Sequence, residues 1–107
     1  MERGSVYWVN LEPSNPPELG KVRPAIVVSN ATHNLALPSV VVIPLSSKKP
    51  QIWPLRVSVR LSNLKESFAI IPGIRQVSKI RLQNLIGYLS KGDLKAVDDA
   101  LQTYLRD

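Results

Sequence analysis

The chain has 107 residues, of which 44% are hydrophobic, and a formal net charge of +6, so it is expected to form one globular domain over residues 1–107. It contains no cysteine, which excludes disulfides and cysteine-ligated zinc. The apolar runs are too short to span a membrane and no basic segment leads into an apolar core at the N-terminus, so we expect a cytoplasmic protein.

The first half of the chain predicts three strands. A β-branched and aromatic run predicts a strand over 6–11, and a segment with three prolines, Ser, Asn and Gly predicts a loop over 12–22. An apolar run predicts a buried strand over 24–29, followed by a loop over 30–38. The aliphatic segment 39–45 predicts a third strand at the centre of the sheet.

Shorter elements are predicted in the second half. Residues 55–61 alternate between apolar and polar or basic side chains, which indicates a half-buried strand with a basic outer face. Pro72-Gly73 ends the strand that precedes it. The remaining elements are strands over 68–71, 74–77 and 85–89 and a helical turn over 78–84.

A C-terminal helix closes the predicted fold. Ser90 has the character of an N-cap, with Asp93 three residues later in a capping-box arrangement. Leu94, Val97 and Leu101 follow with helical spacing, which predicts an amphipathic helix that packs on a sheet. The fold class is therefore mainly β plus α: a small, curved, partly closed SH3-like barrel of about six to seven strands with a C-terminal helix.

The positive charge is concentrated in the middle of the chain. Residues 20–91 contain eleven lysines and arginines and the single acid Glu66, whereas both flanking segments are acidic. Such a distribution indicates a surface for a polyanion, either a nucleic acid or an acidic protein.

Most arrangements of catalytic residues are absent from the sequence. His33 is the only histidine and lies in a predicted loop, which excludes a pair of histidines within one chain. Asp98 and Asp99 are adjacent on a helix, so their side chains point apart and make a poor metal site. No metal or cofactor is therefore expected, and catalysis has to depend on arginine, serine, backbone groups and the substrate itself.

Arg23 stands at the entry to the second strand, directly after the proline-rich loop. A strand anchors its first residues, and the planar guanidinium of arginine suits a phosphate. Judged from these residues alone, the first explanation for Arg23 is structural: an ion pair at the strand edge, with Glu18 as the partner. Ser46 at the end of the third strand has a similar structural explanation, a strand-end cap.

Three segments resemble a known family. They are Arg3-Gly4-Ser5-Val6-Tyr7-Trp8-Val9, Glu18-x-Gly20-x-x-Arg23-Pro24 and Ile74-Arg75-Gln76-Val77-x-Lys79-x-Arg81-Leu82, and the third strand closes on Ser46. Together they resemble the MazF/PemK/Kid toxins nearly from end to end. The resemblance implies a CcdB/MazF-like fold and a metal-independent endoribonuclease. Such an enzyme cleaves single-stranded RNA by attack of the 2′-hydroxyl and leaves a 2′,3′-cyclic phosphate and a 5′-hydroxyl.

The same resemblance implies roles for individual residues. Arg23 is the expected catalytic arginine, and the hydroxyl of Ser46 is expected to contact the scissile phosphate. A homodimer is implied, with RNA along a groove across its interface and a cognate acidic antitoxin competing for that groove. The residues expected to bind RNA are Glu18, Lys21, Lys48, Lys49, Trp53 and Arg75. Trp53 follows a basic segment, which makes it a candidate to stack on a base, and a role as a loop anchor explains it equally well.

The chain departs from the family pattern at two places. Pro16-Pro17-Glu18 stands where Gly-Ser-Glu or Gly-His-Glu is frequent, and Pro72-Gly73 stands where an acid followed by Gln is frequent. The altered positions Pro17, Pro72 and Gly73 predict a weaker nuclease. Two alternatives stay open: a catalytically silent barrel that binds RNA or an antitoxin, and a gyrase-poisoning toxin of the CcdB type.

Overall fold

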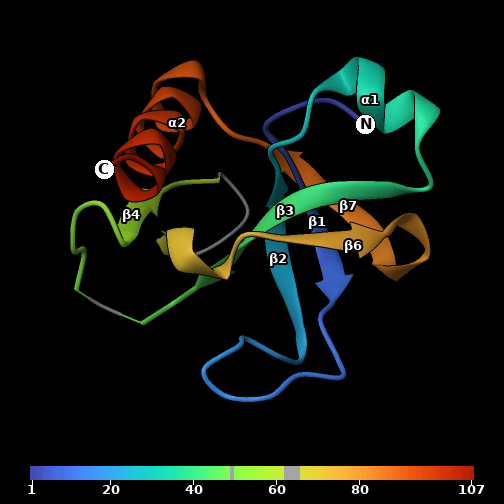
Figure 1. The fold of residues 1–107 in the computed structure, drawn as a ribbon, viewed down its shortest axis with the longest axis horizontal. Helices are drawn as coiled ribbons and strands as arrows, with labels where there is room; N and C mark the ends of the chain where they lie inside the picture. Colours follow the sequence, from blue (N-terminus) through green and yellow to red (C-terminus); the bar gives the residue numbers. More distant parts are fainter. Residues whose placement is uncertain (49, 62–65) are drawn as a thin grey trace.

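The structure is a computed structural model that describes residues 1–48, 50–61 and 66–107. Within these residues the chain forms seven strands, two α-helices and two short 3-10 helices (Figure 1). In chain order the elements are β1 (Ser5–Asn10), β2 (Val22–Val27), α1 (Ala31–Ala36), β3 (Ser39–Ser46), β4 (Arg56–Val59), β5 (Ser67–Ile70), η1 (Ile71–Gly73), β6 (Arg75–Ser78), η2 (Lys79–Arg81), β7 (Leu82–Tyr88) and α2 (Lys91–Leu105).

The strands make one antiparallel sheet in the order β4-β5-β3-β2-β1-β7, with β6 paired to β3. The predicted mainly β fold with a C-terminal helix is confirmed. Among the described residues no pairing joins the outer strands β4 and β7, so the sheet is not closed into a barrel.

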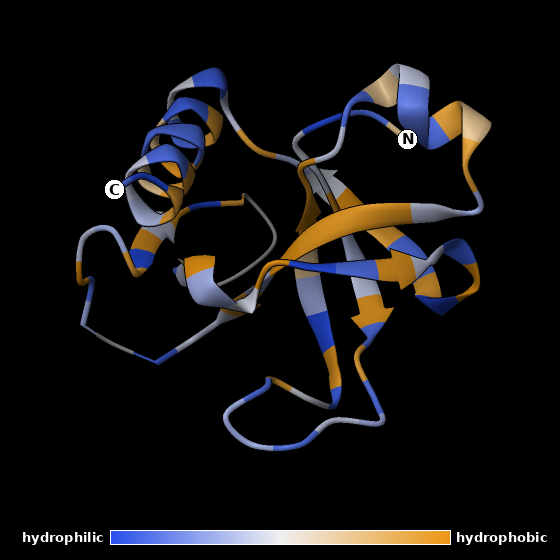
Figure 2. Cartoon of the chain, viewed as in Figure 1, coloured by the Kyte–Doolittle hydropathy of each residue, from blue (hydrophilic) through white to orange (hydrophobic). Residues whose placement is uncertain are grey.

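The two central strands are buried on both faces. In β2, Ile26 packs in one hydrophobic cluster, whereas Ala25 and Val27 pack in another on the opposite face. In β3, Ile43 and Leu45 belong to the cluster of Ile26, whereas Val40 and Val42 belong to the other, which agrees with the predicted central place of this strand. Figure 2 shows β3 as hydrophobic over most of its length, whereas the loop that joins β1 to β2 is largely hydrophilic.

The helix α2 packs on β4 and η1 through its apolar side, where Val97 and Ala100 are fully buried. Ser90 caps it as predicted, because its Oγ accepts a hydrogen bond of 3.1 Å from the backbone nitrogen of Asp93. The second half of the capping box is absent: the Asp93 carboxylate instead accepts from the backbone nitrogen of Arg60 at 3.0 Å. Asp93 therefore ties the first turn of α2 to Arg60, the residue that follows β4.

Two elements differ from the sequence-based expectation. The predicted loop over 30–38 contains the helix α1, because Asn30 caps it and Asn34 is buried, donating to the backbone oxygens of Met1 and Ser29 at 3.0 Å each. The last strand begins at Leu82 rather than at residue 85, since it pairs with β1 along its length. None of the described helices is long and apolar enough to cross a membrane.

Candidate functional site

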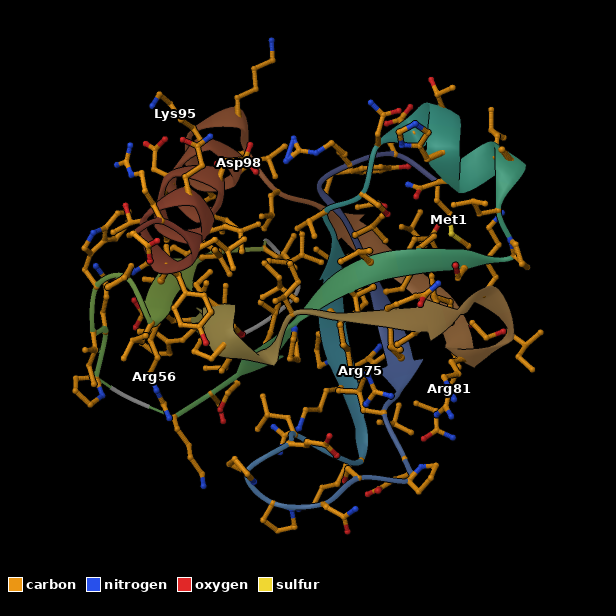
Figure 3. All side chains as sticks on the ribbon, in the orientation of Figure 1. Met1, Arg56, Arg75, Arg81, Lys95 and Asp98 are labelled. Atoms are coloured by element: carbon orange, nitrogen blue, oxygen red, sulfur yellow. The ribbon has the colours of Figure 1, made fainter. Side chains whose placement is uncertain are left out.

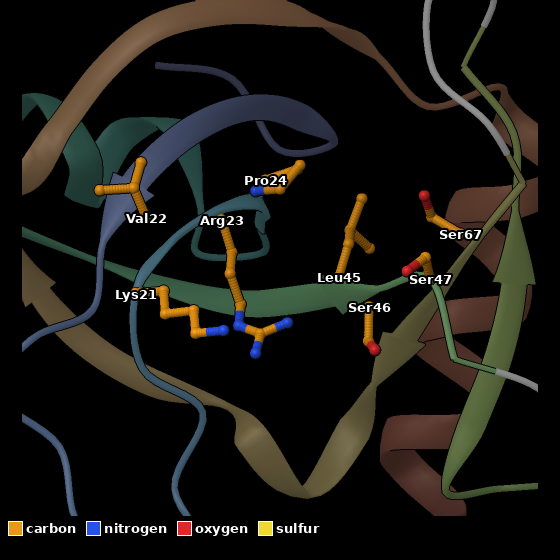
Figure 4. A pocket seen from close by; sticks show the side chains of 8 residues that line it. All are labelled: Lys21, Val22, Arg23, Pro24, Leu45, Ser46, Ser47 and Ser67. Atoms are coloured by element: carbon orange, nitrogen blue, oxygen red, sulfur yellow. The ribbon is translucent and has the colours of Figure 1, made fainter.

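An open pocket of about 360 Å³ lies where β2 begins and β3 ends (Figure 4). These strands are paired, so their neighbouring ends bring residues about twenty positions apart in sequence to one place. Its lining combines two cations, three hydroxyls and apolar side chains: Lys21, Val22, Arg23, Pro24, Leu45, Ser46, Ser47 and Ser67. We call it the first pocket.

Arg23 is half-buried and presents its guanidinium to the first pocket (Figure 4). Its Nε donates a hydrogen bond of 2.8 Å to the carbonyl oxygen of Gly20. Within the described part of the chain, Nη1 and Nη2 have no hydrogen-bond or ion-pair partner. The expected ion pair with Glu18 is not formed, because the Glu18 carboxylate accepts a 2.8 Å hydrogen bond from the backbone nitrogen of Asn15. Two adjacent donors of Arg23 therefore remain for an anionic ligand.

Ser46 is the last residue of β3 and is only 7% exposed. Its Oγ accepts a 3.2 Å hydrogen bond from the backbone nitrogen of Lys48, so the strand-end cap expected from the sequence is present. A hydroxyl that accepts one hydrogen bond still has its own proton to donate. Ser46 can therefore cap the strand and donate to a ligand oxygen at the same time.

Lys21 is exposed and lies next to Arg23 at the mouth of the first pocket (Figure 4). Its backbone has φ of 66°, in the left-handed region, and its nitrogen donates to Glu12 Oε2 at 2.8 Å. That hydrogen bond, together with one from the Ser14 hydroxyl, lowers the pKa of the Glu12 carboxyl below its ordinary value. The turn that carries Lys21 is thus held by the ionised side chain of Glu12, which lies two residues after the end of β1.

Glu18 and Arg75 meet at a second pocket of about 370 Å³ rather than at the first. This second pocket is lined mainly by proline and aliphatic side chains: Pro17, Leu19, Pro44, Ile70, Pro72 and Ile74, together with Gly73. The three altered positions that are expected to weaken a nuclease, Pro17, Pro72 and Gly73, all lie around it. The departures are therefore grouped in space although they are far apart in sequence.

Arg75 is also bound to the protein itself. Its Nη1 donates to the carbonyl oxygen of Leu11 at 3.2 Å, and Arg81 Nη1 donates to the carbonyl oxygens of Asn10 and Glu12 (Figure 3). These two arginines hold the start of the β1–β2 loop (residues 11–21) from the side of β6 and η2. Arg75 thus has a structural role that its sequence context did not indicate.

Two other residues expected to bind RNA, Lys48 and Trp53, line neither pocket. Trp53 is nevertheless 50% exposed, and Lys48 follows Ser46 closely in sequence. The Lys48 carbonyl accepts a 3.1 Å hydrogen bond from Arg56, which connects this segment to β4. Lys49 lies outside the described residues.

Sequence reasoning missed Ser47, Ser67 and Glu12 at or behind the first pocket. Ser67 reaches the pocket because β5 pairs with the end of β3, where Phe68 lies opposite Ser46. Nothing local marks such a cross-strand neighbour. Glu12 had a signal, since it is an acid next to a proline-rich loop that ends at Gly20 and Lys21.

The chemistry offered by the first pocket is the binding of an anion. In the described segments no group of three or more His, Cys, Asp or Glu side chains gathers as a metal site. A fixed guanidinium beside a buried hydroxyl can bind a phosphate and stabilise the charge that develops on it. The pocket is open, so the phosphate can belong to a long polymer.

Comparison with known proteins places the chain among toxins. The model of a family described as PemK-like, MazF-like toxin of type II toxin–antitoxin system matches residues 2–105. A protein of Staphylococcus saprophyticus named Endoribonuclease MazF is 33% identical over 110 residues, covering 98% of this chain and 91% of that protein.

Solved structures share the fold. MazF from Deinococcus radiodurans has a TM-score of 0.86 at 22% identity, covering 98% of this chain and 96% of its own. An endoribonuclease from a mycobacterial species, solved in complex with its cognate antitoxin, has a TM-score of 0.82 at 24% identity, with 98% and 94% covered. MazF in a MazE–MazF complex from Deinococcus radiodurans reaches 0.78 at 19% identity, with 98% and 94% covered.

Proposed function

Because the chain belongs to the PemK-like, MazF-like toxins of type II toxin–antitoxin systems, we propose that it is an endoribonuclease whose active site is the first pocket. The observation that carries this proposal is the pair of Arg23 donors, Nη1 and Nη2, that face the pocket beside the buried hydroxyl of Ser46. Residues 1–107 would act as one toxin domain in the cytoplasm, where messenger RNA is translated.

The reaction that suits these side chains uses the substrate's own nucleophile. The 2′-oxygen of RNA bonds to the adjacent phosphorus while the bond from phosphorus to the 5′-oxygen breaks. The 2′-hydroxyl gives up its proton and the leaving 5′-oxygen gains one, so the products are a 2′,3′-cyclic phosphate and a 5′-hydroxyl. No metal ligand is needed, and DNA, which lacks the 2′-hydroxyl, is not cut.

Arg23 and Ser46 would both donate hydrogen bonds to the scissile phosphate. The Nη1 and Nη2 donors of Arg23 bind the two non-bridging oxygens, where negative charge increases in the transition state. The hydroxyl of Ser46 donates a further hydrogen bond to one of these oxygens. Lys21 adds positive charge at the mouth of the first pocket and attracts the RNA backbone.

The RNA on either side of the cut would follow the remaining basic and aromatic residues. Lys48, Lys49 and Trp53 come from the segment after β3, where the indole of Trp53 is exposed enough to stack on a base. Glu18 and Arg75 would contact RNA at the second pocket, which is large enough for a nucleobase. Arg75 would do so while its Nη1 continues to hold Leu11.

A homodimer would place two such sites along one groove. Trp8 pairs with Pro24 across β1 and β2, and Val22 lies two residues from Pro24 on the same face. Trp8 is 37% exposed and Val22 is 44% exposed, and Val22 and Pro24 also line the first pocket. An apolar surface that continues from the rim of an active site suits a second copy of the chain.

A cognate antitoxin would block the same groove. Relatives with this fold have been solved in complex with an antitoxin, including MazE–MazF from Deinococcus radiodurans. An acidic, disordered segment would be attracted by the basic middle of this chain and would compete with RNA for Arg23 and Lys21. Increasing salt is expected to weaken both interactions.

The first experiment is cleavage of a long single-stranded RNA in EDTA by the wild type and by Arg23→Ala. Cuts with 5′-hydroxyl ends that disappear in the variant support the proposal. RNA that is bound but left intact by the folded wild type indicates the silent RNA-binding barrel instead. Inhibition of gyrase supercoiling without RNA cleavage indicates the gyrase-poisoning alternative, which the family and relative found here do not favour.

A further inference from the structure

The β1–β2 loop (residues 11–21) ends in a turn that is closed by the side chain of Glu12. The loop is closed at its base by a 2.9 Å hydrogen bond from the Leu11 nitrogen to the Lys21 carbonyl. Across this base, Glu12 Oε2 accepts from the Lys21 nitrogen at 2.8 Å, and Oε1 accepts from Ser14 Oγ at 2.9 Å. The carboxylate therefore holds Lys21 in its left-handed conformation, which is strained for a residue with a side chain.

Gly20 leaves the space that this carboxylate occupies. A Cβ atom at residue 20 would lie 2.2 Å from Ser14 Oγ and 2.6 Å from Glu12 Oε2, both closer than real Cβ contacts, so it would displace the carboxylate together with the hydroxyl that donates to it. The carbonyl of the same glycine accepts the 2.8 Å hydrogen bond from Arg23 Nε. Glu12 is thus linked to the guanidinium of Arg23 through two consecutive residues, Gly20 and Lys21.

The backbone at Glu12, where this connection to Arg23 begins, is fixed to the sheet. The backbone nitrogen of Glu12 donates to Asn10 Oδ1 at 3.0 Å, and its carbonyl oxygen accepts from Arg81. The preceding carbonyl, that of Leu11, accepts from Arg75 at 3.2 Å. The backbone of Glu12 is held in this way, and the two hydrogen bonds of its exposed carboxylate then place the side chain against the turn at Gly20 and Lys21.

We propose that Glu12 is a positioning residue for the reaction: its carboxylate fixes the Gly20–Lys21 turn and so aims the Arg23 guanidinium and the Lys21 side chain into the first pocket. The inference rests on the proposed function. Glu12 itself does not line the pocket, so it acts through Gly20 and Lys21 and does not contact the substrate. The same two hydrogen bonds keep the carboxylate ionised, as its lowered pKa indicates.

Electrostatics and positioning predict opposite effects of removing this carboxylate. As a negative charge near a site for RNA, Glu12 weakens the binding of a polyanion, so its removal by itself should lower KM or leave it unchanged. If the Arg23 guanidinium loses its orientation, kcat should fall by about 10-fold or more, because a small displacement of a catalytic group strongly reduces the reaction rate. A fall in kcat without a rise in KM therefore separates positioning from a general contribution to RNA binding.

Three single variants, one double variant and a spectroscopic signal test the proposal. Glu12→Ala removes the acceptor, and Glu12→Gln keeps one acceptor oxygen without the charge and should retain part of kcat. Gly20→Ala alters no charge but displaces the carboxylate, so it should lower kcat in the same way. The double variant Glu12→Ala/Gly20→Ala should be little worse than Glu12→Ala alone. In Glu12→Ala the carboxylate is already gone, and the Ser14 hydroxyl, which the new Cβ would also meet, has lost the acceptor that holds it in place.

The signal is the Nε–H resonance of Arg23 in a nitrogen–proton correlation spectrum, assigned with Arg23→Ala. We expect Glu12→Ala and Gly20→Ala to shift or broaden this resonance. The Nε–H of Arg3, which donates to the Val28 carbonyl at 3.0 Å on another part of the sheet, should not change and serves as the internal control. Glu18→Ala removes an acid from the same loop whose hydrogen bond stays within that loop, so it should leave the Arg23 resonance in place.

Each result decides the question. A changed Arg23 resonance with a lower kcat supports the proposal. An unchanged Arg23 resonance in Glu12→Ala overturns it, and so does a changed resonance with a kcat equal to that of the wild type. If the wild type leaves RNA intact, the proposed function fails. In that case the Arg23 resonance still shows whether Glu12 positions the guanidinium. If Glu12→Ala does not fold, Glu12→Gln and Gly20→Ala provide the same comparison.

Discussion

Arg23 Nε donates a 2.8 Å hydrogen bond to the carbonyl oxygen of Gly20, three residues earlier in the chain. One nitrogen of the guanidinium is therefore used to hold the side chain, and the other two face the first pocket (Figure 4). This division explains how an arginine at a strand entry can be both fixed and available. It also makes the removal of this side chain the most direct test of the site.

Arg23→Ala should lower kcat/KM for RNA by about 10²–10³-fold, because it removes the donors expected to stabilise the phosphate charge. Arg23→Lys should recover only a small part of this loss, since an ammonium cannot present two parallel donors. Initial rates on a fluorescent RNA measure both. Circular dichroism should show that the variants remain folded, and an undiminished rate in Arg23→Ala would remove this residue from the mechanism.

Ser46→Ala tests whether the hydroxyl does more than cap β3. Loss of the bond from the Lys48 nitrogen should cost about 1 kcal/mol of unfolding free energy. Loss of a hydrogen bond to the phosphate should in addition lower kcat by about 10-fold. Urea unfolding and single-turnover cleavage separate the two effects. A loss of stability with an unchanged rate would leave Ser46 as a structural cap only.

Lys21→Ala should reduce the salt dependence of RNA binding. Each phosphate contact to a single strand contributes about 0.7 to the slope of log K against log salt, so the variant should lower the slope by about that amount. A 2′-O-methyl RNA, which cannot be cut, allows equilibrium titrations at several salt concentrations. Lys95→Ala is the control, because Lys95 pairs with Asp99 on α2 at 2.9 Å; an equal effect of both variants would contradict a local contact.

The carboxyl of Glu12 predicts a change of stability with pH. Its pKa in the folded protein is below the ordinary value of 4.5, chiefly because the Lys21 backbone nitrogen and then the Ser14 hydroxyl donate to it. Its contribution to stability is therefore fully present above that value and is lost as the pH falls through the lower pKa of the folded state. Urea unfolding of the wild type and Glu12→Gln should differ more at about pH 6 than at about pH 3. A difference that is constant with pH would contradict the assignment.

Gly73→Ala tests the packing behind the second pocket. A Cβ at this position would lie 2.8 Å from Cγ of Pro44, a rigid ring on the buried strand β3, so the variant should lose about 1–3 kcal/mol of unfolding free energy. Gly92→Ala is the matched control. Nothing lies within 4 Å of its Cβ, and alanine in α2 should stabilise the protein by about 0.5–1 kcal/mol. Equal stability of Gly73→Ala and the wild type would show that the Pro44 ring moves enough to accommodate the new Cβ.

The sequence by itself determined most of the fold. Alternation of apolar residues, aliphatic runs and the Ser90 cap are local signals, and they predicted the central strands β2 and β3 and the helix α2 within a few residues. The motif around Arg23 likewise indicated the family, which the family model and a relative at 33% identity then showed. These features could be read because each depends on residues that are close together in the chain.

Only the tertiary structure decided which residues share a site. The pairing of β2 with β3, and of β3 with β5, brings Arg23, Ser46 and Ser67 around one pocket, whereas Pro17, Pro72 and Gly73 gather around another. It also showed that Arg23 forms no ion pair with any of the described residues, and that the Glu12 carboxylate holds the turn before it. Such relationships arise from strand register and loop closure, which join residues far apart in the chain and leave no local pattern in the sequence.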